Sequence, residues 1–170
     1  NLGRTSAVYF LSKLTASIFG FVATIIIARI LGAGPLGTYN LVLGLVSWLG
    51  IVGKVGVTGA ISKRVSEGDD QEQYAAAGLV LVFFMSSAIA VGLFAFRPYV
   101  NSYIGQPVTV YVILILFVTL TQSIASSLLS GVHLVHLRGL LAPLRTGVRS
   151  LLQIGTVLAG LGVIGLFLGY

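Results

Sequence analysis

The chain has 170 residues and a formal net charge of +6, with 56% hydrophobic and only 8% charged residues. Because a soluble domain carries roughly 25% charged residues, this composition excludes a water-soluble surface. The cations stand singly or in pairs between apolar runs, which excludes a nucleic-acid partner, and the absence of cysteine excludes disulfides and thiol chemistry.

Five apolar segments are long enough to cross a hydrocarbon core about 30 Å thick, which takes about 20 helical residues. In chain order they cover residues 7–31, 36–62, 74–96, 109–135 and 144–168. The short breaks between them contain Gly, Pro and charged residues, so neighbouring helices should run antiparallel. We therefore predict an all-α fold, a polytopic transmembrane bundle with about five spans.

The distribution of cations predicts the orientation of this bundle. Most Lys and Arg residues near span ends lie on one side, whereas Arg29 and Arg97 lie on the other. The positive-inside rule then predicts a multi-pass protein of the cytoplasmic membrane whose amino terminus lies in the cytoplasm. All acidic residues gather in one stretch, Glu67–Glu72, which we interpret as a solvated loop with a helix cap at Asp70 and Gln73.

In the first segment, Lys13 lies on one arc with Ser17, Gly20 and Thr24. Small residues also recur at every fourth position, a pattern that favours close approach of another helix. They are Ser12, Ala16, Gly20, Thr24, Ala28 and Gly32. Lys13 has two interpretations, contact with a wet cavity and snorkelling of its charge to the interface.

In the second segment, Asn40, Ser47, Lys54 and Thr58 fall within an arc of about 80° if the helix is continuous. Lys54 would lie about 12 Å of helix rise from the cytoplasmic end. A buried cation is costly, so Lys54 should face a wet cavity, a partner or an anionic ligand, unless it snorkels.

The fourth segment has a polar face whose members lie within about 100° of one another. They are Thr119, Gln122, Ser123, Ser126, Ser130 and His133. Such groups can line water or can bond to helix carbonyls and neighbouring helices.

The fifth segment begins with Arg145 and Arg149, one turn apart, and continues with Gln153 and Thr156 on the same face. These arginines either mark the interface or form an entry for an anionic head group. Together the polar arcs predict a bundle around a hydrated, cationic cavity.

The remaining motifs do not indicate a catalytic, metal-binding or nucleotide-binding site. Residues 160–165 match the Gly-x-Gly-x-x-Gly spacing, yet they lie in an apolar segment without a preceding strand, so we interpret them with Gly169 as helix packing. His133 and His136 have no nearby Cys, Asp or Glu to complete a metal site. We expect no catalytic residues, no metal and no cofactor, and hence no enzyme.

Residues 28–39, Ala-Arg-Ile-Leu-Gly-Ala-Gly-Pro-Leu-Gly-Thr-Tyr, resemble a signature of polysaccharide flippases in the multidrug/oligosaccharidyl-lipid/polysaccharide exporter superfamily. The pattern Gly56, Gly59-Ala60 and Arg64, and the turn from Ser130-Gly131 to Arg138, are similar to that family too. The resemblance implies two six-helix lobes around a central cavity. This chain, residues 1–170, would be most of the first lobe, without its sixth helix and the carboxyl-terminal lobe.

The same resemblance implies that the protein flips a polyprenyl-(pyro)phosphate-linked oligosaccharide across the membrane by alternating access, for cell-envelope glycan assembly. Its partners would be this anionic lipid-linked glycan, membrane lipid and the missing lobe. Cavity cations would bind the substrate, which points to Lys54, Arg145 and Arg149, then to Lys13 and Arg29. Arg29 could instead cap its own helix.

Three alternatives stay open at this point. A lipid II-type flippase is related and would carry a similar substrate. A cation-coupled drug antiporter of the same superfamily is disfavoured, since no span here holds Asp or Glu. A membrane enzyme acting on lipid phosphates would need carboxylate or His residues facing the cavity.

Overall fold

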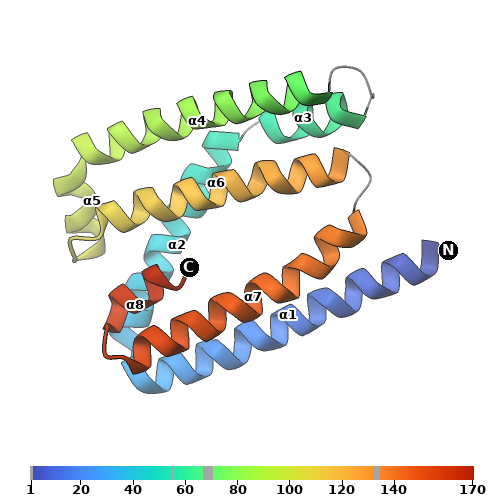
Figure 1. The fold of residues 1–170 in the computed structure, drawn as a ribbon. Coiled ribbons are helices and arrows are strands. Elements are labelled where there is room, and N and C mark those ends of the chain that lie inside the picture. Colours follow the sequence, from blue (N-terminus) through green and yellow to red (C-terminus); the bar gives the residue numbers. More distant parts are fainter. Residues whose placement is uncertain (1, 55, 67–70, 132–134) are drawn as a thin grey trace. The chain divides into compact units, whose positions relative to one another are not determined.

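The computed structural model describes residues 2–54, 56–66, 71–131 and 135–170, which form helices joined by short connections (Figure 1). The helices are α1 (Leu2–Leu31), α2 (Ala33–Lys54), α3 (Val57–Ser66), α4 (Gln71–Ala95), α5 (Arg97–Ile104), α6 (Thr109–Gly131), α7 (Val135–Leu158) and α8 (Gly162–Leu168). The predicted all-α class is confirmed. Residues 67–70, with the predicted cap at Asp70, and His133 lie outside the described residues.

Four helices in the described residues are long and apolar enough to cross a membrane, namely Phe10–Leu31, Ala33–Lys54, Glu72–Ala95 and Thr109–Leu129. Their large apolar side chains point outward at many positions; Phe21 is 68% and Phe84 65% exposed. Such surfaces are stable in lipid and not in water. The chain is therefore part of a multi-pass membrane protein.

The second predicted segment is divided into two helices. α2 ends at Lys54, and α3 begins at Val57, after Gly56 with a φ of 75°. This left-handed conformation suits glycine and interrupts the helical register. The continuous segment 36–62 was therefore wrong as a single helix.

The fifth predicted segment is also divided. α7 ends at Leu158, and Gly160 (φ 83°) and Gly162 (φ 56°) turn the chain so that α8 packs against α7. Gly160 and Gly162 are thus turn residues rather than helix-packing residues. The packing role holds for Gly165, where a Cβ would lie 3.1 Å from the carbonyl carbon of Thr156.

By its contacts the chain divides into two compact units, which we describe separately. Unit 1 comprises Asn1–Asn40 and Val135–Tyr170. Within it α1 and α7 lie side by side and run in the same direction (Figure 1). Gly20 of α1 lies in this contact, because a Cβ there would be 3.8 Å from Thr146 Cγ2.

Unit 2 comprises Leu41–Leu134. Here α6 packs against α3 and α4, and α4 and α6 run antiparallel with α5 between their ends (Figure 1). Leu116 and Leu120 of α6 are fully buried in this unit. A Cβ on Gly53 of α2 would lie 3.1 Å from Leu120 Cδ1, so the end of α2 belongs to the same core.

Candidate anion-binding site

A group of hydrogen-bonded side chains lies inside unit 1, and we call Tyr39, Arg149 and Gln153 the Tyr39 cluster. Tyr39 is 7% and Gln153 6% exposed, whereas Arg149 is half-buried. Arg149 Nη2 donates a hydrogen bond to Tyr39 Oη. Gln153 Nε2 donates to the same oxygen at 2.8 Å and to the Leu166 carbonyl at 2.9 Å. One phenolic oxygen therefore accepts from both α7 side chains.

The local sequence explains this arrangement. Arg149 and Gln153 are four residues apart, so they share one face of α7. Tyr39 lies near the start of α2. The turn at Gly160 returns the chain, and α8 then supplies the Leu166 carbonyl to Gln153.

Glycine permits the close approach of the chain after α8 to α7. A Cβ on Gly169 would lie 2.7 Å from the backbone nitrogen of Gln153, which is closer than side-chain carbons come. Thr156 adds a second tie, since its hydroxyl donates to the Gly165 carbonyl at 2.8 Å. Gln153 is thus enclosed by backbone on the α8 side.

Within the cluster, the side chains hydrogen-bonded to Tyr39 are one cation, Arg149, and one neutral amide, Gln153. Residues 1–40 and 135–170 contain no Asp or Glu, so unit 1 offers Arg149 no acidic side chain. The guanidinium carbon lies 3.9 Å from the ring centroid of Tyr170, a cation–π distance. A half-buried cation is most stable with an opposite charge, and a guanidinium has five N–H donors, of which Tyr39 takes one. The arrangement suits an anion with several oxygens.

The other predicted site residues of unit 1 lie outside the Tyr39 cluster. Arg145, Lys13 and Asn40 are exposed. Arg29 is exposed in the last turn of α1, where its charge favours the carboxyl-terminal end of the helix dipole. The structure brings Arg149 and Gln153 together through Tyr39.

In unit 2, Lys54 is half-buried and is the last residue of α2. The sequence placed it inside a continuous helix, and this was wrong because α2 ends at Lys54; its charge lies at the negative end of the α2 dipole. Thr58 lies beyond the Gly56 break, so it does not share a continuous helical arc with Lys54. Ser47 is exposed and donates to the Leu43 carbonyl at 2.8 Å.

On α6, the predicted residues Gln122 and Ser126 are both half-buried. The side chain of Ser130 lies outside the described residues. The most exposed side of this helix is mainly apolar, with Leu114 55% and Val118 42% exposed. The predicted polar face therefore avoids the most exposed side of α6.

Sequence reasoning missed the role of Tyr39. This residue closes the family-like stretch at residues 28–39, but its partners are distant in sequence. An aromatic residue near the start of an apolar helix usually indicates an interface or a core position. The burial of its hydroxyl and its two hydrogen-bond donors are visible only in the structure, so the local sequence offered no signal for this role.

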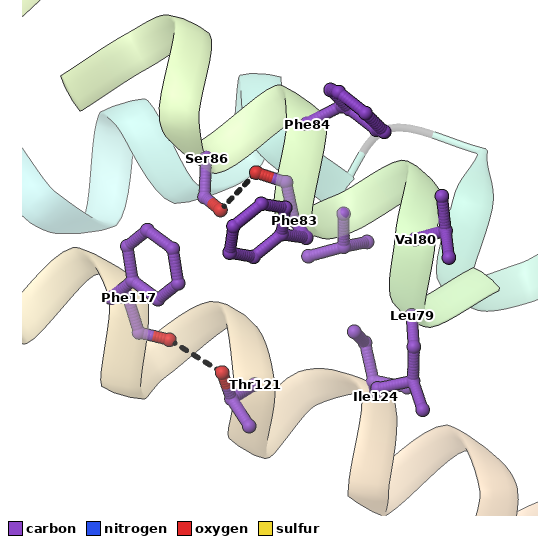
Figure 2. A pocket seen from close by; sticks show the side chains of 9 residues that line it. Leu79, Val80, Phe83, Phe84, Ser86, Phe117, Thr121 and Ile124 are labelled. Carbon is purple, nitrogen blue, oxygen red and sulfur yellow. Dashed lines mark hydrogen bonds between the residues drawn. The ribbon is translucent and has the colours of Figure 1, made fainter. Parts of the chain in front are cut away.

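Unit 2 contains a groove of about 440 Å³ between α4 and α6. Figure 2 shows its wall of apolar side chains, among them Leu79, Phe83, Phe117 and Ile124. Its two hydroxyls bond to their own helices: Thr121 donates to the Phe117 carbonyl and Ser86 to the Phe83 carbonyl, each at 2.9 Å. With only satisfied hydroxyls, the groove does not suit a charged head group.

The chain matches the family described as polysaccharide biosynthesis protein over residues 2–167. It is 29% identical over 131 residues to a probable low-salt glycan biosynthesis flippase, Agl15, of Haloferax volcanii, covering 77% of this chain and 28% of the relative. It is 31% identical over 173 residues to a probable flippase, AglR, of the same organism, covering 99% of this chain and 36% of the relative. The chain thus spans about a third of these curated relatives. No solved structure matches it significantly.

Proposed function

We propose that the whole protein is a transporter that flips a lipid-linked glycan between membrane leaflets. The proposal starts from the family: this chain belongs to the polysaccharide biosynthesis protein family. Two relatives named as flippases and the multi-pass architecture support transport. The substrate would be an oligosaccharide joined to a polyprenyl carrier through phosphate or diphosphate. It would cross the cytoplasmic membrane by alternating access, with the amino terminus of this chain in the cytoplasm.

The observation that carries the substrate proposal is the Tyr39 cluster in a unit without acidic residues. A phosphate or diphosphate would supply the negative charge that Arg149 lacks. Arg pairs with phosphate through two parallel N–H donors, a geometry that Lys cannot reproduce. Arg145, exposed one turn earlier on α7, would add a second cation.

The neutral partners of Arg149 matter for binding. Tyr39 is held by Gln153, and Gln153 is held by the Leu166 carbonyl, so the acceptor that orients the guanidinium is fixed. A side chain that is oriented before binding loses less conformational entropy on contact with the ligand. A carboxylate at the same place would orient Arg149 equally well but would cancel its charge.

The test is Arg149→Gln in the full-length protein, measured as export of the envelope glycan in cells that depend on it. A charge-assisted hydrogen bond contributes about 1.5–3 kcal/mol, so export at limiting substrate should fall roughly 10- to 100-fold. Arg149→Lys should give an intermediate loss, because it keeps the charge without the planar donors.

Lys63→Gln is the matched control, because Lys63 is an exposed cation in the last turn of α3, outside the Tyr39 cluster. It should export normally. Membrane abundance is measured for every variant. Normal export by Arg149→Gln at normal abundance would refute the assignment of the cluster to the substrate.

A further inference from the structure

α5 is a short helix with two exposed tyrosines. Tyr99 is 74% and Tyr103 69% exposed, and they lie one turn apart on one face. Arg97, at the start of the helix, is exposed too. Tyrosine side chains this exposed are stable in surroundings that are favourable for both the apolar ring and the polar hydroxyl.

The opposite face of α5 is fixed to unit 2. Ile104 is buried at 6% exposure. Asn101 Oδ1 accepts hydrogen bonds from the backbone N–H of Thr109 at 3.2 Å and from its hydroxyl at 2.7 Å. Gly105 ends the helix in the left-handed conformation with a φ of 79°. The tyrosines therefore point outward because the helix is held, rather than because the segment is loose.

The position of α5 identifies that medium. It begins directly after the candidate span Glu72–Ala95 and ends shortly before the candidate span Thr109–Leu129. Figure 1 shows it at the shared end of α4 and α6, which run antiparallel. Two spans that end together do so where hydrocarbon gives way to water, so α5 lies at that boundary.

The exposed aromatic residues become more polar along the chain from the end of α4 into α5. Phe94 and Phe96, at the end of the span, are 61% and 62% exposed and wholly apolar. The rings of Phe96 and Tyr99 lie 6.2 Å apart, and from Tyr99 onward the exposed rings carry hydroxyls. Tyr is favoured at head-group level, where its ring is in apolar surroundings and its hydroxyl is wet.

We propose that α5 is an interfacial helix that inserts Tyr99 and Tyr103 between phospholipid head groups, with Arg97 beside the lipid phosphates. The occupant of this surface is the bilayer's own phospholipid. The helix would hold the α4–α6 pair at a fixed depth. This role is independent of the substrate that the protein carries.

The test measures depth with a spin label at Ser102→Cys, which keeps both tyrosines and lies exposed on α5. The full-length protein, with its other cysteines replaced, is reconstituted in phospholipid bilayers. Collision rates are measured with oxygen, which concentrates in hydrocarbon, and with a nickel chelate, which stays in water. Phe84→Cys, in the middle of α4, serves as the hydrocarbon control, and Lys63→Cys as the aqueous control.

We expect the Ser102→Cys label to collide with both reagents, at a depth between the two controls. Adding Tyr99→Ala and Tyr103→Ala should move it toward the aqueous control, whereas Tyr99→Trp and Tyr103→Trp should leave it in place. Collision with nickel alone would mean a water-exposed helix, and collision with neither would mean a covering protein partner. Either result, or a depth equal to that of Phe84→Cys, would overturn the proposal.

Discussion

Tyr39→Phe deletes one oxygen from the centre of the Tyr39 cluster and leaves the ring in place. The ring packs against Phe167 with centroids 5.8 Å apart, and this contact persists in the variant. Two hydrogen bonds are lost, one from the Arg149 guanidinium and one from the Gln153 amide. Arg149 keeps its charge but loses the acceptor that orients it.

The magnitude follows from those two bonds. Side-chain hydrogen bonds inside membrane proteins average about 0.6 kcal/mol and reach about 1.7 kcal/mol. The charged donor places the Arg149 bond in the upper part of this range. Tyr39→Phe should therefore lower the free energy of unfolding by about 1–3 kcal/mol. Gln153 keeps its bond to the Leu166 carbonyl, which limits the loss.

The assay is equilibrium unfolding of the full-length protein in mixed micelles, arranged as a double-mutant cycle with Gln153→Met. Methionine keeps an unbranched chain and removes the amide. Because the two side chains share one bond, the cycle should give a coupling of about 0.6–1 kcal/mol. Tyr74→Phe is the control, since its ring contact with Arg64, at 5.7 Å, does not use the hydroxyl.

Two outcomes would refute this reasoning. Additivity of Tyr39→Phe and Gln153→Met within about 0.3 kcal/mol would mean that the side chains do not interact. A loss no greater than that of Tyr74→Phe would mean that the shared acceptor contributes nothing. Export should also fall in Tyr39→Phe, but less than in Arg149→Gln, because the cation remains.

Two further predictions concern glycines. Gly160→Ala should destabilise the full-length protein by about 1–2 kcal/mol in the same unfolding assay, because its φ of 83° is costly for any residue with a Cβ. Gly155→Ala, in open space on α7, should be neutral or stabilising; equal losses would contradict the α7–α8 turn. Gly20→Leu should cost about 1–3 kcal/mol by overfilling the contact between α1 and α7, where a Cβ already lies 3.8 Å from Thr146. Gly44→Leu, which meets open space, should cost much less, and a tolerated Gly20→Leu would contradict close packing of α1 on α7.

The apolar helices could be predicted well from sequence because lipid imposes simple demands. A span must be apolar on nearly all sides and long enough for a membrane of fixed thickness. The segment 74–96 corresponds to α4 at Gln71–Ala95, and the segment 109–135 starts with α6 at Thr109. Neither demand depends on which helices are neighbours.

The helix breaks could not be predicted from the same information. Gly56 and Gly160 lie in stretches whose composition suits a continuous helix, and glycine is common inside membrane helices. What ends the helices is the sign of φ at one residue, to which a hydropathy pattern is insensitive. The prediction of a continuous helix around Lys54 was wrong because it missed the break at Gly56.

The candidate site shows the same division between local and distant information. Arg149 and Gln153 could be paired because four-residue spacing puts them on one face of α7. Tyr39 could not, because its partners are 110 and 114 residues away in the chain. The spacing of neighbouring residues does not indicate which residues more than 100 positions away will be in contact.

The neutrality of the partners of Arg149 is what gives the cluster its chemical character. A membrane helix usually stabilises an arginine by pairing it with an acid, which fixes the side chain and removes its affinity for other anions. Here the tyrosine oxygen and the glutamine amide fix the geometry, while the positive charge stays uncompensated by any acidic residue of unit 1. Under the proposed function such a site would suit an anionic group that arrives and leaves, because release would cost only the ligand's own contacts. Gln153→Glu would place a carboxylate beside Arg149, and the expected result is a structural ion pair with weaker binding of the proposed anionic ligand.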